Sequence, residues 1–312
     1  MRGDPLPWLL DPSRPNLHWR VLTDLIHRPP DSPAVVRARG GADAVDPVAS
    51  LLEDLMPDGS WVGDAGLWEK YSGPGWRLWA AVQWGADPSD PRLHAASLRL
   101  LEEAPGTGGF AVNEGREPAP WLTARVLQGL ARLGWCRHSR FQEAVAWLDE
   151  AALRSADGGW IGSGGDGDSV ACGITPVALL DALTVCGDAN RAALRERAVR
   201  AVFSTVAAAG AEFFLLGHPN IDRTDAAEAL SVLARAGATL DPEIVAALSR
   251  LQGLQGDGGR WPRGVEVPES LPVGGRPRTG EASKWITLAA ATAILHYAVE
   301  AGLPRMFPQR PS

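Results

Sequence analysis

"LQGLQGDGGRW" (251–261) is the stretch that decides the fold, because its glycine-rich turn and closing tryptophan recur along the chain. Related turns precede it: "PDGSW" with Asp58, "GTGGF" with Thr107 and "ADGGW" with Asp157. Asp58 to Thr107 spans 49 residues, and Thr107 to Asp157 spans 50. The next step, from Asp157 to Asp257, is 100 residues, so a degenerate copy is expected near residue 207. Self-similarity at a fixed period of this length indicates an architecture built from repeated units.

Two kinds of helical pattern alternate with these turns. Amphipathic stretches precede them, as at 90–104, 141–155 and 241–254. The first and last of these begin with Asp-Pro, which combines an N-cap with proline at the first helical position. More apolar stretches follow the turns, and a leading copy lies at 17–27. The glycines that close the apolar stretches are C-cap signals: Gly85, Gly134, Gly187, Gly237 and Gly302.

Six apolar helices alternating with five amphipathic ones predict an all-α fold. Helices that are apolar on most faces belong inside, and helices with one polar face belong outside. We therefore expect a single domain over residues 1–312, an α/α toroid with about six inner helices and five to six outer ones. An open α-solenoid built from the same helical pairs is the competing architecture.

The composition narrows the classes of function. A net charge of -7 and a pI near 5.4 argue against a nucleic-acid partner. Neither a signal peptide nor a run long enough to span a bilayer is visible, so we expect no integral membrane segment. Three cysteines, an odd number, suggest free thiols and a cytoplasmic location. No pattern indicates a cofactor or an obligate protein partner, and the histidines lack metal-ligand spacing.

The glycine-aromatic turns resemble the prenyltransferase and squalene-cyclase repeat, in which Asp-Gly-Gly and an aromatic residue follow the end of a helix. The strongest matches are the quoted stretch 251–261 and "RSADGGWIG" (154–162). The segments 68–79, 225–233 and 281–295 are similar to stand-alone bacterial members of about this length. The resemblance implies the toroid fold and a terpenoid cyclase-like enzyme acting on a small hydrophobic or amphipathic substrate.

The segment "NIDRTDAAEAL" (220–230) departs from the family's acid motif. Class II terpene cyclases open a helix with Asp-x-Asp-Asp-Thr-Ala and place the proton donor where this chain has Thr224. The chain also lacks the Asp-x-Cys pair of the zinc-dependent protein prenyltransferases. "GWCRHS" (134–139) resembles half of a lanthionine cyclase site, but "ACGIT" (171–175) lacks its histidine. We therefore predict no metal site.

In the predicted toroid, parallel inner helices gather their N-termini around one mouth, above an apolar lumen. Each N-terminus carries a partial positive charge and unpaired N–H groups, so the mouth favours anionic groups. Both lysines of the chain fall at this predicted mouth. The predicted catalytic residues are Asp225, Asp222 and Tyr71, and the predicted substrate-binding residues are Lys70, Lys284, Trp76, Trp121, Thr123, Thr224, Trp285 and His218.

These residue types suggest acid–base chemistry. If the helix starts near Asp222, Asp225 lies one turn on, and two close carboxylates in an apolar mouth raise the pKa of one of them. The alternative is that Asp222 is a helix cap and Asp225 a first-turn acid. Lys70 is expected to bind an anionic group or to lower the pKa of Tyr71, or else to form a surface ion pair. Lys284, at a helix N-terminus, needs a carboxylate partner or an anionic ligand.

Three functions remain open on this evidence. The first is cyclisation, isomerisation or elimination on a terpenoid or similar substrate, with tryptophan faces stabilising a cation. The second is a carbohydrate-active enzyme with tryptophan platforms and a carboxylate pair. The third is a non-catalytic toroid that binds a ligand or a partner. A deep apolar lumen favours the first function, a shallow groove the second, and a lumen filled by its own side chains the third.

Overall fold

The computed structural model describes residues 3–63, 66–103, 108–112, 116–154, 160 and 173–300. The regular secondary structure of these residues is helical, and they contain no strand, only the isolated bridges Leu55–Trp61 and Pro262–Ala282. The prediction of an all-α protein is confirmed. Several predicted turn residues, namely Thr107, Asp157 and Gly302, lie outside the described part of the chain.

The helices fall into a central and a peripheral set. The central set is α2 (Pro15–Arg20) with the π-helix η1 (Val21–Leu25), α5 (Pro74–Gln83), α7 (Pro120–Arg132), α9 (Ile174–Cys186), α11 (Ala226–Arg235) and α13 (Lys284–Glu300). The peripheral set is α1 (Leu6–Leu9), α3 (Pro33–Arg39), α4 (Val48–Leu52), α6 (Pro91–Glu103), α8 (Ser139–Arg154), α10 (Ala192–Ala207) and α12 (Pro242–Gly253). Short 3-10 turns lie at Ala42–Ala44, Trp135–Arg137, Ala189–Arg191, Glu212–Phe214 and Asp257–Gly259.

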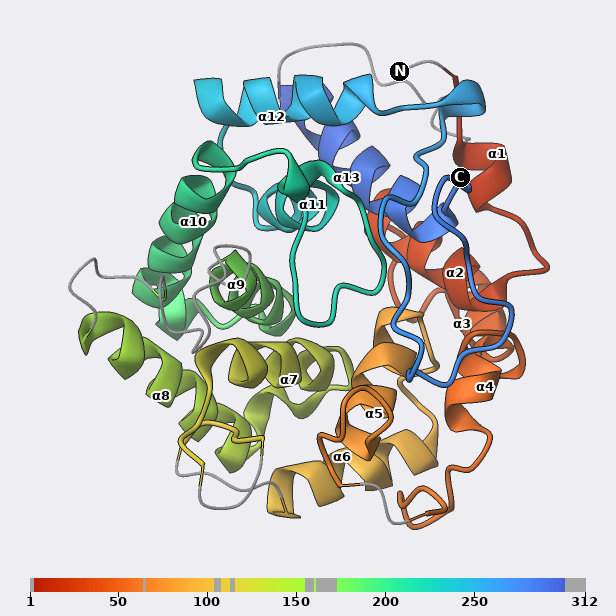
Figure 1. The fold of residues 1–312 in the computed structure, drawn as a ribbon, viewed down its shortest axis with the longest axis vertical. Coiled ribbons are helices and arrows are strands. Elements are labelled where there is room, and N and C mark those ends of the chain that lie inside the picture. The colour runs from red at the N-terminus through yellow and green to blue at the C-terminus, as the bar shows by residue number, and fades with distance from the viewer. Residues whose placement is uncertain are drawn as a thin grey trace.

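The central helices pack in chain order around the middle of the molecule (Figure 1). Helix α5 packs on α7, α7 on α9, α9 on α11, and α11 on α13, which in turn contacts η1. Two side chains of α2 reach the end of α5: Asn16 Nδ2 donates to the Trp84 carbonyl at 3.0 Å, and Trp19 Nε1 donates to the Gly85 carbonyl at 2.7 Å. Figure 1 shows α6, α8, α10 and α12 at the periphery.

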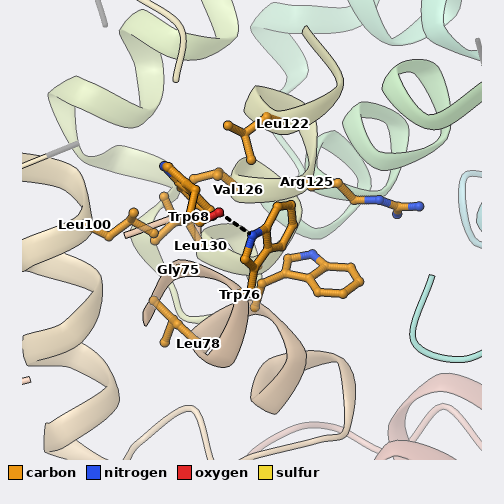
Figure 2. Close-up of a pocket in the computed structure, with 11 residues that line it drawn as sticks. Trp68, Gly75, Trp76, Leu78, Leu100, Leu122, Arg125, Val126 and Leu130 are labelled. Carbon is orange, nitrogen blue, oxygen red and sulfur yellow. Dashed lines mark hydrogen bonds between the residues drawn. The ribbon is translucent and has the colours of Figure 1, made fainter. Parts of the chain in front are cut away.

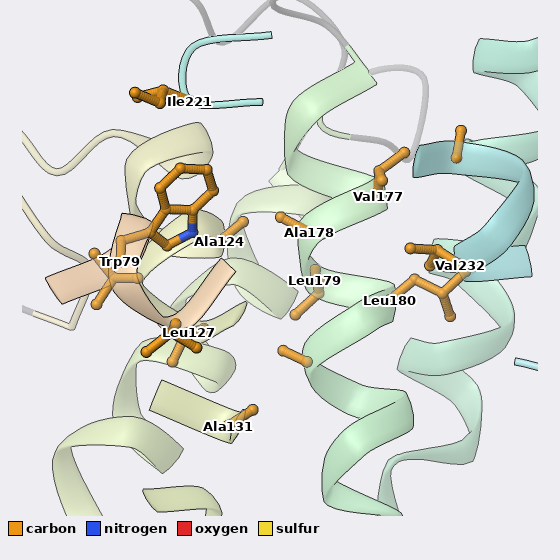
Figure 3. Close-up of a cluster of buried hydrophobic side chains, with 14 of the residues drawn as sticks. Trp79, Ala124, Leu127, Ala131, Val177, Ala178, Leu179, Leu180, Ile221 and Val232 are labelled. Atoms are coloured by element: carbon orange, nitrogen blue, oxygen red, sulfur yellow. The ribbon is translucent and has the colours of Figure 1, made fainter. Parts of the chain in front are cut away.

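Burial explains why the two sets differ. Residues 174–183 of α9 are all buried, whereas α12 buries only Ile244, Ala247 and Leu251. The apolar core is continuous across α5, α7, α9 and α11: Trp79 lies beside Leu127 of α7, whereas Leu180 of α9 lies beside Val232 of α11 (Figure 3). Burial on every face favours the central position for the apolar helices, as their sequences predict.

The recurring tryptophan has one structural role in each described copy. Trp61 Nε1 donates to the Leu51 carbonyl at 2.9 Å, and Trp261 Nε1 donates to the Leu251 carbonyl at 2.8 Å. Trp160 Nε1 makes the same bond to the Leu148 carbonyl at 2.8 Å. Each indole therefore ties a turn back to the peripheral helix before it. The closing glycines Gly85, Gly134, Gly187 and Gly237 have φ between +64° and +88°, the left-handed conformation of helix C-caps.

The expectation of free thiols is wrong for two of the three cysteines. Cys136, beside the end of α7, forms a disulfide with Cys186, the last residue of α9. Their separation of 50 residues matches the sequence repeat, which brings equivalent helix ends together. Cys172 lies outside the described residues. Within the described chain, no helix combines the length and apolar character needed to cross a membrane.

Candidate functional site

The predicted mouth brings Tyr71 and Asp222 into direct contact. The Tyr71 hydroxyl donates a hydrogen bond to Asp222 Oδ2, and the backbone N–H of Tyr71 donates to Ser270 Oγ at 3.0 Å. Burial, followed by the bond to the Asp222 carboxylate and its charge, raises the pKa of Tyr71 above its ordinary value. The prediction that Lys70 lowers this pKa is therefore wrong. Lys70 is exposed, with its ammonium 5.1 Å from the centre of the Tyr71 ring.

The two predicted catalytic aspartates do not form a pair on one helix. Helix α11 begins at Ala226, so Asp225 is its N-cap and accepts the Glu228 N–H at 2.9 Å, while Asp222 precedes the helix and is exposed. Asp225 is fully buried and also accepts from the Gly217 N–H at 2.7 Å and from Asn220 Nδ2 at 3.0 Å. Burial raises its pKa, against the effect of these hydrogen bonds. The negative charge of Glu228, and not that of Asp222, adds to the rise in the pKa of Asp225.

The tryptophans of the mouth pack against each other. Trp76 stacks on Trp121 with ring centroids 6.0 Å apart, and it meets Trp68 edge to face at 5.2 Å. The cavity beside them, between α5 and α7, has a volume of only about 10 Å³ (Figure 2). A space of that size holds at most about one water molecule, so the slot is packing rather than a substrate site.

The two predicted substrate-binding threonines are buried and satisfied within the protein. Thr123 Oγ1 accepts the backbone N–H of Phe110 at 2.8 Å, which fixes the turn to α7. In another copy of the repeat, Thr287 Oγ1 accepts the backbone N–H of Trp261 at 3.0 Å. The bond from the turn to a threonine of the following central helix is therefore a feature of the repeat. Thr224, at the position of the family's proton donor, donates to Glu228 Oε2 at 2.9 Å.

Lys284 has the carboxylate partner that the sequence analysis expected as one option. Its ammonium donates to Asp11 Oδ2 and to the Trp8 carbonyl, both at 2.8 Å, and lies 5.2 Å from the centre of the Trp8 ring. Lys284 therefore holds the N-terminal segment onto α13.

A polar chamber of about 80 Å³ lies among the central helices. All six contribute to its lining, together with Gly217, His218 and Asn220 from segment 208–225, which crosses in front of the central helices in Figure 1. The cavity differs from the apolar lumen that the sequence predicted, because charged side chains line it beside apolar ones. The charged residues of the lining are Arg20, Asp24, Arg132, Asp181, Glu228 and Arg235.

Ion pairs between neighbouring helices form much of the chamber wall. Asp181 of α9 accepts from Arg132 of α7 at 2.7 Å and from Arg235 of α11 at 2.7 Å. Burial raises the pKa of Asp181, but the two guanidinium charges outweigh it and hold that pKa well below its ordinary value. Arg125, fully buried, pairs with Glu228 at 2.5 Å. Arg20 pairs with Asp24 at 2.6 Å on one helical turn.

His218 forms part of the chamber wall. Its ring stacks on Trp285 at 4.9 Å between centroids and meets Trp84 edge to face. Burial, and then the charges of Arg263 and Arg20, lower the pKa of His218 well below its ordinary value, so the imidazole is neutral near pH 7. Its buried Nε2 atom has no hydrogen-bond partner in the described structure.

Of the predicted substrate-binding residues, His218 and Trp285 line the chamber, whereas its charged residues were not predicted from the sequence. A signal was present: the most apolar helices carry charged or amide side chains in their interiors, where a buried helix has no surface to place them. Among these are Asp24, Gln128, Arg132, Asp181 and Glu228. Within the described residues, no group of three or more histidine, cysteine or carboxylate side chains is arranged to hold a metal ion.

Comparisons with known proteins add little to this geometry. No family model matches the chain, and no curated protein matches it. One solved structure, a crystal structure of a protein from Actinoplanes, is similar with a TM-score of 0.47 and 15% sequence identity. That similarity covers 90% of this chain and 89% of the other. It is too distant to carry an argument about function.

Proposed function

We propose that the helices form an α/α toroid of the prenyltransferase and squalene-cyclase type, and that the protein binds a small polar ligand in the chamber at its centre. The successive packing of α5 to α13, and the contacts of α13 with η1 and of α2 with α5, support the closed arrangement. The glycine-aromatic turns support the family.

The observation that carries the ligand proposal is a set of polar atoms with no partner around one cavity. Four chamber residues contribute a buried atom that forms no hydrogen bond within the described structure: Gln83 Nε2, Arg132 Nε, His218 Nε2 and Asn220 Oδ1. Asn220 is only 6% exposed. Leaving a buried polar group unsatisfied costs about 1–3 kcal/mol, so a cavity that gathers four of them is suited to a polar occupant.

The chamber's polarity weighs against a hydrocarbon substrate. Terpenoid cyclisation needs an apolar cavity and an acid strong enough to protonate an alkene. Here charged side chains border the cavity, and Thr224 already donates to Glu228. The cyclase function remains a prediction from the resemblance, and the ligand-binding toroid is the function that the geometry favours.

A ligand screen with a chamber-filling variant tests this proposal. Ala289 of α13 lines the chamber, whereas Ala207 at the end of α10 is exposed. We expect at least one small polar compound to raise the melting temperature of the wild type and of Ala207→Leu, since a ligand bound only by the folded state stabilises it. Ala289→Leu should abolish that rise. Stabilisation by isoprenoid alcohols alone, or a rise unaffected by Ala289→Leu, would contradict the proposal.

The contact between Tyr71 and Asp222 favours a second candidate function, acid–base catalysis at the mouth. With its pKa raised, the Tyr71 hydroxyl keeps its proton and donates a hydrogen bond that orients the Asp222 carboxylate, and this carboxylate is placed to accept a proton as a base. If the protein turns over a compound found in the screen, Tyr71→Phe and Asp222→Asn should each lower kcat by about a hundredfold or more and leave binding in the chamber unchanged. Unaltered kcat in both variants would exclude this role.

A further inference from the structure

We propose that the chamber's ligand is a short organic carboxylate, a monoanion with an apolar end. The inference rests on the proposed function and names the class of ligand. Three properties of the chamber lead to it: an ion-pair network with one guanidinium group more than carboxylates, guanidinium donors that the ion pairs leave unused, and apolar side chains in the same lining.

The unbalanced charge is found at Asp181. This single carboxylate, 2% exposed as a side chain, is bound by two guanidinium groups, those of Arg132 and Arg235. The remaining pairs are one to one, Arg20 with Asp24 and Arg125 with Glu228. The lining itself holds three guanidinium groups and three carboxylates, and the ion-pair network, extended to Arg125, holds four guanidinium groups and three carboxylates. A buried charge without a counter-charge is strongly unfavourable, so an anion is the expected occupant.

The donors that remain are suited to a carboxylate. Arg132 engages Asp181 through one terminal nitrogen, and its Nε has no hydrogen-bond partner among the described residues. Arg235 also engages Asp181 through one terminal nitrogen. Burial, and then the like charge of Arg132, lowers the pKa of Arg20 to about 10, with Arg235 adding to the effect. Three guanidinium groups thus act on the same space, and a guanidinium binds a carboxylate through parallel N–H bonds.

Part of the chamber wall is apolar. Helix α13 supplies Ile286, Leu288 and Ala289 to the lining. The cavity of about 80 Å³ corresponds to about five water molecules. A bare inorganic anion would leave this apolar part without a contact, whereas a carboxylate with a short alkyl chain contacts both parts of the wall.

Binding of propionate to the whole protein, measured by calorimetry in low-chloride buffer, tests the inference. Propionamide is the neutral probe of nearly the same shape, and inorganic phosphate and chloride are the inorganic probes. We expect propionate to bind at least about tenfold more tightly than each of the other three. Arg235→Gln removes the extra charge but retains a donor for Asp181, which keeps Arg132 and Gln128. This variant should lose at least about tenfold in propionate affinity.

The matched control is Arg200→Gln, the same substitution in an exposed ion pair on α10, which should leave propionate binding unchanged. Equal binding of propionate and propionamide would contradict the hypothesis that the ligand is a carboxylate. It would leave the proposed binding of a small polar ligand intact. If chloride or phosphate bound as tightly as propionate, the hypothesis that the ligand has an apolar end would be contradicted. Because these comparisons use the wild type, they decide the matter even if Arg235→Gln does not fold. If no small polar compound binds at all, the proposed function itself fails.

Discussion

At the scale of single residues, the two aspartates of segment 220–230 have different structural roles. Asp222 is exposed and bonds the Tyr71 hydroxyl. Asp225 is buried, caps α11, and accepts from Gly217 and Asn220 as well. Because Gly217 and Asn220 both line the chamber, Asp225 fixes the part of segment 208–225 that closes it. Asp225 is thus a positioning residue for the chamber.

Replacing Asp225 should cost more than the loss of an ordinary helix cap. Asp225→Ala removes the cap and leaves the Gly217 N–H and Asn220 Nδ2 without that acceptor, so we expect a loss of about 3 kcal/mol in unfolding free energy. Asp241, which caps α12 by accepting the Ile244 N–H, is the matched control. Asp241→Ala should cost about 1 kcal/mol. Equal losses in denaturant unfolding would show that Asp225 is only a cap.

A second residue-scale prediction concerns pH. Burial, opposed by the bond from the Asp87 N–H and reinforced by Asp90 and Asp87, raises the pKa of Asp43 to about 7. The folded protein therefore keeps this proton up to about pH 7, whereas the unfolded chain releases it near pH 3.8. Stability must fall as pH rises through this window, because the unfolded state then binds fewer protons. Asp43→Asn should remove that fall and raise the melting temperature at pH 8. Parallel stability curves for the two proteins between pH 4 and 8 would refute the assignment.

At the scale of elements, the repeat could be predicted and the chamber could not. Turn, tryptophan and closing glycine are local signals, and Trp61, Trp160 and Trp261 make the same bond in the structure. The chamber depends instead on which face of each central helix turns inward. That choice is set by packing among helices far apart in sequence, such as the contact of α7 with α9. Polar residues inside apolar helices mark the site but do not reveal how they pair.

Thr123 has two possible roles, stabilising the repeat or binding the ligand, and the two roles predict different effects of substitution. As the acceptor for the Phe110 N–H, Thr123 belongs to the repeat, and Thr123→Val should lower the unfolding free energy by about 1–3 kcal/mol. Thr123→Ser keeps the acceptor and should restore most of that loss. Neither substitution should alter ligand affinity in the chamber. If Thr123→Val weakens ligand binding while the melting temperature is unchanged, the threonine serves the site instead.

At the scale of the whole molecule, the toroid that we propose depends on contacts between the two ends of the described chain. Leu9, Leu17, Val21 and Leu288 form a small apolar cluster there, separate from the main core. The disulfide acts elsewhere, between the ends of α7 and α9. The spacing of its cysteines equals the repeat, so the pairing could have been inferred from the period. The odd number of cysteines led to the expectation of free thiols, because a count does not indicate which cysteines lie close together in the fold.

The two lysines of the chain offer a test of how the N-terminal segment is held on α13. Lys284 bonds the Trp8 carbonyl and Asp11, and its bond to the Asp11 carboxylate, followed by the bonds from Ser13, lowers the pKa of Asp11 well below its ordinary value. Lys284→Met should lower the unfolding free energy by about 1 kcal/mol and speed hydrogen exchange in residues 6–25. Lys70→Met, which loses only an exposed contact with the Tyr71 ring, should change neither.

The pH dependence separates the ion pair from simple packing of the lysine stem. A carboxylate whose pKa is lowered in the folded state stabilises it above its ordinary pKa, and that contribution is lost as pH falls. The stability difference between Lys284→Met and the wild type should therefore be full at pH 7 and shrink below about pH 3.8, the ordinary value for Asp11. A difference that persists undiminished in acid would assign the effect to packing on Trp8. Unchanged exchange at pH 7 would mean that the N-terminal segment is held by its apolar cluster alone.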